Sequence, residues 1–497
     1  MSEPLPDHPD LDQLRRQAKN LLADWRAGRP ESFDLLVVHH PQHRTRPADP
    51  SALRLADAQL VIARRHGLRS WAALRDEVEL RQLSLRQRAQ RMVQHAISTT
   101  PGSGGTPLRV AMQLLDRDPK LASFDAYTAL VAGDLGRVQR RLAADPAWVR
   151  TPGGPCPGRL PLHYTTFSRL HRLDRAVADG LLACARALLD AGADVDAGFS
   201  GEDTWGSVLR PLYGASGAAA FPEMVELLLD RGARIDDGEA LYHATCNHDT
   251  RCLELLLARG GDPNGVNVLA HAIDARDPAA LRLLLAHGGN ANGTMHDGTP
   301  LLTRAVALGR EPVFLELLLA HGADPNVRDR SGRSAVALAR AHAHIDLAEQ
   351  LLAAGATDDG DAFSAFVAAA LAGGRQPPPA CMTHADVVAW FGIVQRPDSS
   401  AAMRMLDAGM PVDLVDAHAQ TALHWAAWRG RASLVDRLLD AGAPIEPREM
   451  QFGGTPLGWA VHGSRQAPRD GGDHLAVVAR LLRAVPIRRC ATPGARR

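Results

Sequence analysis

The chain has 497 residues, more than one ordinary globular core, so its length predicts several domains or an elongated repeat fold. Its 56 basic and 56 acidic residues balance, which argues against broad electrostatic attraction to nucleic acid or to an anionic membrane. No run approaches the roughly 20 apolar residues of a membrane span, and the acidic, proline-rich start lacks the apolar core of a signal peptide. We therefore expect a cytoplasmic protein without a membrane partner.

The basic charge is almost entirely arginine, because Lys19 and Lys120 are the only lysines. With abundant alanine, glycine and proline, this composition is typical of a GC-rich bacterial coding sequence. The six cysteines show no Cys-x-x-Cys pair. Cys184 and Cys252 lie in apolar helical stretches, so we expect buried, reduced thiols.

The first 84 residues predict a small helical domain. Asp10 can cap a helix with Leu and Trp side chains on one face that ends at Gly28. A short apolar segment, 33–38, precedes a polar loop, and further helices are expected over 51–66 and after Ser70. Residues 85–157 then predict two degenerate helical pairs, because two similar Leu/Asp-Pro segments, 114–119 and 141–146, lie 27 residues apart (145 − 118). The Gly- and Ser-rich segment 99–106 is expected to be a loop between helices.

A Leu-rich run followed by a glycine recurs from residue 158 onwards. Its terminal glycines are Gly192, Gly232, Gly260, Gly288, Gly322, Gly355, Gly409 and Gly442. The last copy shows most clearly why each copy predicts a pair of helices. Thr421 can cap a first helix, Gly430 can end it, and a second helix follows with an apolar face. The spacing varies from 28 residues (288 − 260) to 33 (442 − 409) and more, so some copies are too short for a projecting hairpin and others carry insertions.

The segment Thr421-Ala422-Leu423-His424-Trp425-Ala426 and the 33-residue period resemble the ankyrin repeat. The resemblance implies an all-α fold, an ankyrin-repeat α-solenoid with short hairpin loops, here preceded by the small helical domain. Residues 55–64 and Ser70-Trp71 further resemble a helical module that precedes ankyrin repeats in bacterial proteins. Only His163 and His424 keep the signature histidine.

The pattern is interrupted between residues 358 and 402, where three consecutive prolines exclude regular structure. This stretch is either a decayed repeat or a hinge. After residue 486 the pattern stops without a capping helix, so the last repeat should be frayed, or covered by a partner or a second copy of the chain. The expected organisation is a helical N-terminal domain, degenerate helical pairs, ankyrin repeats, an irregular insertion, C-terminal ankyrin repeats and a disordered tail: 1–84, 85–157, 158–357, 358–402, 403–485 and 486–497.

The sequence offers no recognisable catalytic, cofactor-binding or metal site. Phosphate-loop, zinc-protease and serine-hydrolase signatures are missing. The pairs His342/His344 and His243/His248 lack the four-residue spacing that places two metal ligands on one helical face. The His- and Arg-rich loop 39–46 is an ordinary solvated loop or a small anion-binding patch.

These observations predict a non-catalytic scaffold or adaptor that binds a protein partner through the concave repeat surface. Trp425 and Trp459 occupy equivalent positions and are expected to pack between repeats, whereas Trp428 either anchors a partner or covers the join. The candidate binding residues are His418, Trp428, Arg429, Met450, Gln451 and Phe452, which are types enriched at interfaces or lie in the same rim. Two alternatives remain open: an effector or enzyme whose activity lies in the N-terminal domain, and a nucleic-acid-associated regulator.

Overall fold

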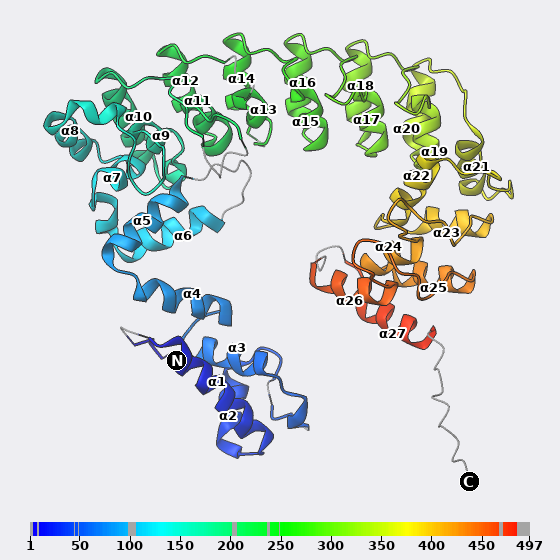
Figure 1. The fold of residues 1–497 in the computed structure, drawn as a ribbon, viewed down its shortest axis with the longest axis horizontal. Helices are drawn as coiled ribbons and strands as arrows, with labels where there is room; N and C mark the ends of the chain where they lie inside the picture. The colour runs from blue at the N-terminus through cyan, green and yellow to red at the C-terminus, as the bar shows by residue number, and fades with distance from the viewer. Residues whose placement is uncertain are drawn as a thin grey trace. The chain divides into compact units, whose positions relative to one another are not determined.

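The computed structural model describes residues 3–6, 9–43, 45–47, 49–97, 106–200, 206–235, 239–247, 249–466 and 471–484 (Figure 1). Within these ranges the chain is helical, and its extended segments make isolated β-bridges rather than strands. The chain divides into two compact units, residues 1–233 and 234–497.

The first four helices of unit 1 enclose a hydrophobic core of their own, which includes the fully buried Trp25, Leu36 and Leu74. Asp10 and Ser70 cap α1 and α4, as predicted. The apolar segment 33–38 lies inside a helix, and the third helix begins later than predicted because residues 50–52 form a 3₁₀ turn. The helices are α1 (Leu11–Arg26), α2 (Pro30–His39), α3 (Leu55–Arg65) and α4 (Trp71–Gln82).

Two basic side chains of the loop 39–46 contact the helical domain, and one of them is buried. His40 is buried, with its Nε2 atom 3.4 Å from a carboxylate oxygen of Asp57. The guanidinium of Arg46 lies over the ring of Phe33, 4.3 Å from its centroid. Burial therefore removes His40 from the anion-binding patch considered from the sequence, whereas Arg46 remains exposed.

The remaining helices of unit 1 stack in pairs. In the segment where two degenerate pairs were predicted, α5 packs against α6 and α7 against α8. Residues 99–105 of the predicted inter-helix loop lie outside the described residues, and residue 106 begins α6. Residues 201–205 also lie outside the described residues, and a bridge joins Phe199 to Leu209 on either side of them. The helices are α5 (Leu85–Ala96), α6 (Thr106–Arg117), α7 (Ala126–Ala132), α8 (Leu135–Ala144), α9 (Pro161–Thr166), α10 (Arg175–Asp190), α11 (Pro211–Tyr213) and α12 (Pro222–Asp230).

Unit 2 begins with four helix pairs in which each first helix packs on the next first helix and each second helix on the next second helix (Figure 1). The eight terminal glycines of both units adopt a left-handed backbone with φ between +84° and +98°, as the sequence predicts. The pairs are α13 (Glu239–Ala244) with α14 (Arg251–Ala258), α15 (Val268–Asp274) with α16 (Pro278–Ala286), α17 (Leu301–Ala307) with α18 (Pro312–Ala320), and α19 (Ala335–Ala341) with α20 (Ile345–Ala353).

Asparagine side chains join the turns of neighbouring repeats in this part of unit 2. The carboxamide of Asn264 accepts from the N–H of Asn290 at 2.7 Å and donates to the carbonyl of Gly288 at 3.2 Å. Asn292 bonds the turn of the following repeat in the same way, with 2.8 Å to the N–H of Asp324 and 2.7 Å to the carbonyl of Gly322. Each turn is thereby held to the next by side-chain-to-backbone hydrogen bonds.

The irregular stretch 358–402 packs into a hydrophobic core that runs from Ala341 to Leu481. Arg333, itself buried, pairs with the carboxylates of Asp361, at 2.6 Å, and of the buried Asp386. The helices α22 and α23 pack against α24 and α25, as one helix pair packs against the next. The helices of this part are α21 (Ala362–Leu371), α22 (His384–Val394), α23 (Ser400–Asp407), α24 (Ala422–Trp428), α25 (Ala432–Asp440), α26 (Pro456–Gln466) and α27 (His474–Ala484).

Candidate functional site

The signature histidine His424 connects the last two repeats. Thr421 caps α24, and its N–H donates to Nδ1 of His424 at 3.1 Å. The other ring nitrogen, Nε2, lies 3.2 Å from the carbonyl oxygen of Gly454 in the next hairpin loop. Burial lowers the pKa of His424, although the bond to Gly454 works in the opposite direction. A neutral imidazole thus accepts from its own repeat and donates to the next.

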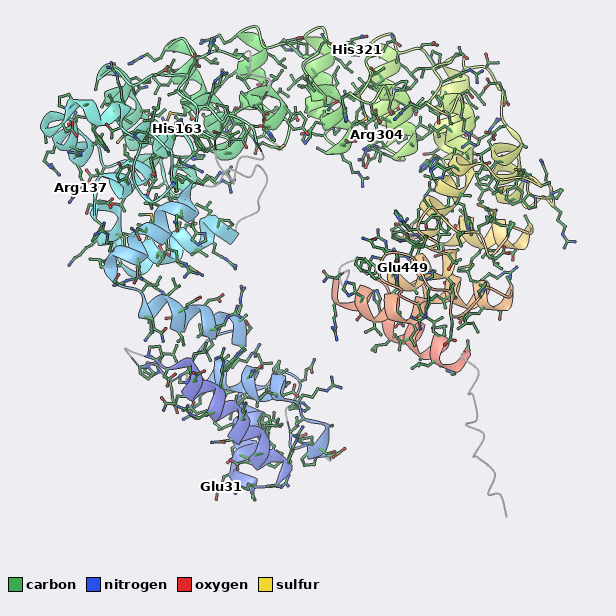
Figure 2. All side chains as sticks on the ribbon, in the orientation of Figure 1. Glu31, Arg137, His163, Arg304, His321 and Glu449 are labelled. Carbon is green, nitrogen blue, oxygen red and sulfur yellow. The ribbon has the colours of Figure 1, made fainter. Side chains whose placement is uncertain are left out.

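The same pair of hydrogen bonds through the two ring nitrogens occurs in unit 1 at His163, which is labelled in Figure 2. The N–H of Leu160 donates to its Nδ1 atom at 2.9 Å, and its Nε2 atom lies 2.6 Å from the carbonyl oxygen of Ala197. Burial lowers the pKa of His163 to about 4. Both signature histidines are therefore structural links between successive loops.

The hairpin loop 449–454 is shaped by one carboxylate, that of Glu449 (Figure 2). The side chain is 2% exposed and accepts from the N–H groups of Gln451 at 2.7 Å, Phe452 at 2.9 Å and Gly454 at 2.8 Å. Burial alone would raise the pKa of the Glu449 carboxyl, but these three hydrogen bonds hold it below its usual range. The loop leaves Phe452 81% and Met450 76% exposed.

Helix α26 approaches α24 closely at Gly463. A Cβ atom at Gly463 would overlap the carbonyl oxygen of Trp428 and lie 3.0 Å from its carbonyl carbon. The same carbonyl oxygen is 2.9 Å from Nε2 of His474, at the start of α27. Three helices therefore fix the backbone at Trp428, and with it the direction of the indole.

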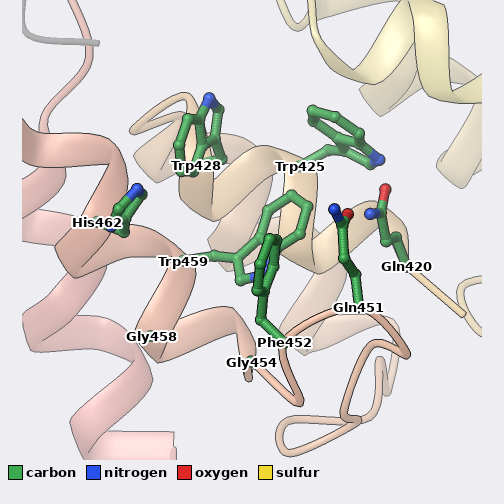
Figure 3. Close-up of a pocket in the computed structure, with 9 residues that line it drawn as sticks. All are labelled: Gln420, Trp425, Trp428, Gln451, Phe452, Gly454, Gly458, Trp459 and His462. Atoms are coloured by element: carbon green, nitrogen blue, oxygen red, sulfur yellow. The ribbon is translucent and has the colours of Figure 1, made fainter. Parts of the chain in front are cut away.

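Three indoles surround an apolar pocket on these two repeats (Figure 3). The ring of Trp459 meets that of Trp425 edge-to-face, with centroids 5.2 Å apart and an interplanar angle of 85°, and that of Trp428 at 5.7 Å and 67°. In Figure 3 Trp425 and Trp428 stand on either side of Trp459, which forms the floor. The cavity has a volume of about 650 Å³ and is lined by Gln420, Trp425, Trp428, Gln451, Phe452, Gly454, Gly458, Trp459 and His462.

The pocket contains some of the candidate residues named from the sequence and not others. Trp428, Gln451 and Phe452 line it. Met450 lies beside it on the same loop, where its N–H donates to the carbonyl of His418 at 2.9 Å. Arg429 is outside the lining, and its carbonyl faces Gly472 before α27.

Four lining side chains were absent from the sequence-based candidates. Trp425 and Trp459 were expected to pack between repeats, and the edge-to-face contact confirms that packing, but the same rings also face the pocket. His462 stacks on Trp428, with ring centroids 5.3 Å apart, and Gln420 precedes the capping Thr421. The equivalence of Trp425 and Trp459, 34 residues apart (459 − 425), is the signal that could have identified the pair.

A second cluster in the described ranges brings a cysteine close to two histidines without forming a metal site. Cys246 lies 3.6 Å from His243 and 3.5 Å from His271, yet no group of three His, Cys, Asp or Glu side chains in these ranges is placed to hold a metal. Burial raises the pKa of the Cys246 thiol to about 11, which disfavours a thiolate. Among the described residues, Cys184 and Cys252 are buried and form no disulfide, as predicted. No helix in the described part of the chain has the length and apolarity needed to cross a membrane.

Comparisons with known proteins identify the repeats. A family model for ankyrin repeats in three copies matches residues 212–297, and a single ankyrin-repeat model matches residues 418–448. A Danio rerio protein described as "Putative palmitoyltransferase ZDHHC13" is 30% identical over 134 residues; the match covers 25% of this chain and spans 19% of that relative's length.

Two solved structures are similar over nearly their whole length. The ankyrin repeat domain of Bcl-3, described as a member of the IkappaB protein family, is 24% identical with a TM-score of 0.35, over 45% of this chain and 96% of that one. The human ASB11 ankyrin repeat domain is 22% identical with a TM-score of 0.27, over 48% and 96%. On the family matches and the stacked helix pairs, the chain carries ankyrin repeats, and its fold is an all-α ankyrin-repeat solenoid.

Proposed function

We propose that the protein is a non-catalytic, cytoplasmic binding scaffold of bacterial origin, and that the tryptophan pocket of its last two repeats receives a side chain of a protein partner. Ankyrin repeats support a protein-interaction role for the chain in general. The observation that carries the specific site is the pocket itself: an apolar hollow walled by three indoles, with the highly exposed Phe452 at its edge. Tryptophan-lined pockets of this kind are where binding energy concentrates at protein interfaces.

Two features favour partner binding over a purely structural role for the aromatic residues. Packing between repeats needs Trp459 and the inner faces of Trp425 and Trp428, but it does not need Phe452, which is 81% exposed. A large apolar side chain held in water by a loop that Glu449 fixes is unfavourable unless another surface covers it. Among the described residues 239–357 of the earlier repeats in unit 2, no Phe, Tyr or Trp side chain is exposed.

The test is a synthetic peptide array, containing unmodified and side-chain-modified residues, that is probed with the full-length chain and its variants. Peptides bound by the wild type should lose about thirtyfold in affinity with Trp428→Ala, the roughly 2 kcal/mol expected of a central anchor. Phe452→Ala should also weaken binding, and because Phe452 is exposed its loss cannot be attributed to unfolding. Trp71→Ala, which truncates a half-buried tryptophan in unit 1, is the matched control. Peptides that bind all four proteins equally would contradict the proposed site.

A further inference from the structure

The tryptophan pocket is lined by aromatic rings, which interact with ligands more specifically than aliphatic side chains do. Trp459 stands nearly perpendicular to Trp425 and at 67° to Trp428, so the three indole planes that line the pocket are steeply inclined to one another, and His462 stacks on Trp428. Figure 3 shows Phe452 in front of Trp459, with Trp425 and Trp428 on opposite sides of it. The face of an aromatic ring carries negative charge density, and several faces around one point attract a cation.

The pocket offers this attraction without a charged hydrogen-bond acceptor. None of the nine lining residues is Asp, Glu, Lys or Arg. The carboxylates nearest in sequence to the lining residues already accept hydrogen bonds from loop backbone groups. Glu449 accepts from three N–H groups, and Asp416 accepts from those of His418 and Gln420 at 2.9 Å each. The remaining acceptors in the lining are neutral, chiefly the amides of Gln420 and Gln451.

We propose that the tryptophan pocket recognises a methylated ammonium group, of which a trimethyllysine side chain of a partner protein is the best fit. The inference rests on the proposed function, and it names the chemistry of the partner's anchor. A trimethylammonium is cationic but has no N–H group, so it gains from the indole faces and leaves no donor unpaired. An unmodified lysine or arginine would bring N–H groups into a pocket without a carboxylate, and an unpaired buried donor is costly.

The dimensions of the pocket agree with a peptide-borne group. The volume of about 650 Å³ exceeds that of one ammonium head, so the pocket also has room for the apolar stem and flanking residues. The mouth is bounded by the loop 449–454, whose Met450 and Phe452 side chains extend into solvent. These side chains are placed to cover the residues on either side of the modified one.

The test compares three small probes by titration of the intrinsic tryptophan fluorescence of the full-length chain. The probes are N-acetyl-trimethyllysine amide, its neutral isostere with tert-butyl in place of trimethylammonium, and N-acetyl-lysine amide. Because the first two have nearly the same shape, their difference measures the cation–π contribution. We expect the trimethyl probe to bind at least about tenfold more tightly than the isostere. We also expect Trp428→Ala and Phe452→Ala to weaken it, and Trp71→Ala to leave it unchanged.

The outcomes separate this inference from the proposed function. Equal binding of the trimethyl probe and the isostere would overturn recognition of the cation, and leave an apolar anchor site in place. Failure of the trimethyl probe, combined with array peptides that depend on Trp428 but carry no methylated residue, would overturn the inference alone. Array binding that does not depend on Trp428 would overturn both. Tighter binding of N-acetyl-lysine amide than of the trimethyl probe would also refute the inference, because it would show that hydrogen bonds to the neutral acceptors of the lining outweigh the attraction of the methylated cation to the indole faces.

Discussion

The close approach of α26 to α24 predicts opposite effects for two glycine-to-alanine changes in one helix. At Gly463 the added methyl group would overlap the carbonyl oxygen of Trp428 and lie 3.0 Å from its carbonyl carbon, where non-bonded carbon atoms prefer about 3.5–4.0 Å. Relief of the contact with the carbonyl carbon alone needs a separation of about 0.5–1 Å, and the closer carbonyl oxygen requires the helices to move further apart than that. Overpacking of this kind costs about 1–3 kcal/mol, against a gain of about 0.5–1 kcal/mol from replacing a helical glycine. We expect a net loss of about 1–2 kcal/mol in the stability of the last two repeats.

Gly458→Ala is the matched control because Gly458 lies in the same helix, and a methyl group there meets only Thr455 Oγ1, at 3.7 Å. This variant should be neutral or up to about 1 kcal/mol more stable. Hydrogen exchange of the α24 and α26 amides gives the local stability, and the tryptophan emission maximum reports the pocket. Equal protection in Gly463→Ala and the wild type would show that the close approach does not constrain these helices.

Two further predictions concern buried polar groups. Burial lowers the pKa of His163 to about 4 from an ordinary value of 6.5. The contribution of the neutral His163 to the free energy of unfolding is therefore complete above about pH 6.5 and is lost as the pH falls towards 4. The pKa difference corresponds to a loss of about 3 kcal/mol in the free energy of unfolding by pH 4. Hydrogen exchange in α9 should show this pH dependence in the wild type and lose it in His163→Gln, and an equal dependence in both proteins would count against the assignment. Arg333→Met should leave the buried Asp386 without its cation and destabilise α22 by about 3–5 kcal/mol. Arg333→Met with Asp386→Asn should recover part of that loss, and no recovery would mean that the guanidinium acts by packing alone.

Local signals explain why the repeat architecture could be predicted from the sequence. Thr421 caps α24 and Gly430 takes a left-handed backbone because each residue type has a strong preference for its position, and neither effect depends on distant residues. The secondary structure of the segment 33–38 was harder to predict, because a six-residue apolar run fits a strand or a buried helix equally well. Only the neighbouring helices α1 and α3 select the helical form.

The pocket depends on contacts between segments and was only partly predictable. Trp428 and Phe452 could be named as candidates, but the loop that brings Phe452 to the pocket is held by Glu449 through backbone N–H groups. Backbone donors carry no sequence signature, so this loop conformation could not be deduced. Arg429, which follows α24 as its C-cap, lies outside the pocket lining with its backbone carbonyl close to Gly472, and its role in binding stays a prediction.

The asparagine bonds between turns have a consequence for how this part of the chain can change in length. Asn264 and Asn292 each bind the backbone of the following turn through both carboxamide atoms, and neither bond involves a core side chain. A repeat that ends in such a turn therefore offers the same carboxamide oxygen and carboxamide N–H group to the backbone of whichever repeat follows it. Duplication or loss of a whole repeat between residues 262 and 324 would preserve these junctions, whereas insertion of a single residue within a turn would break them. Variation by complete repeats is thus the change that this stretch tolerates most readily.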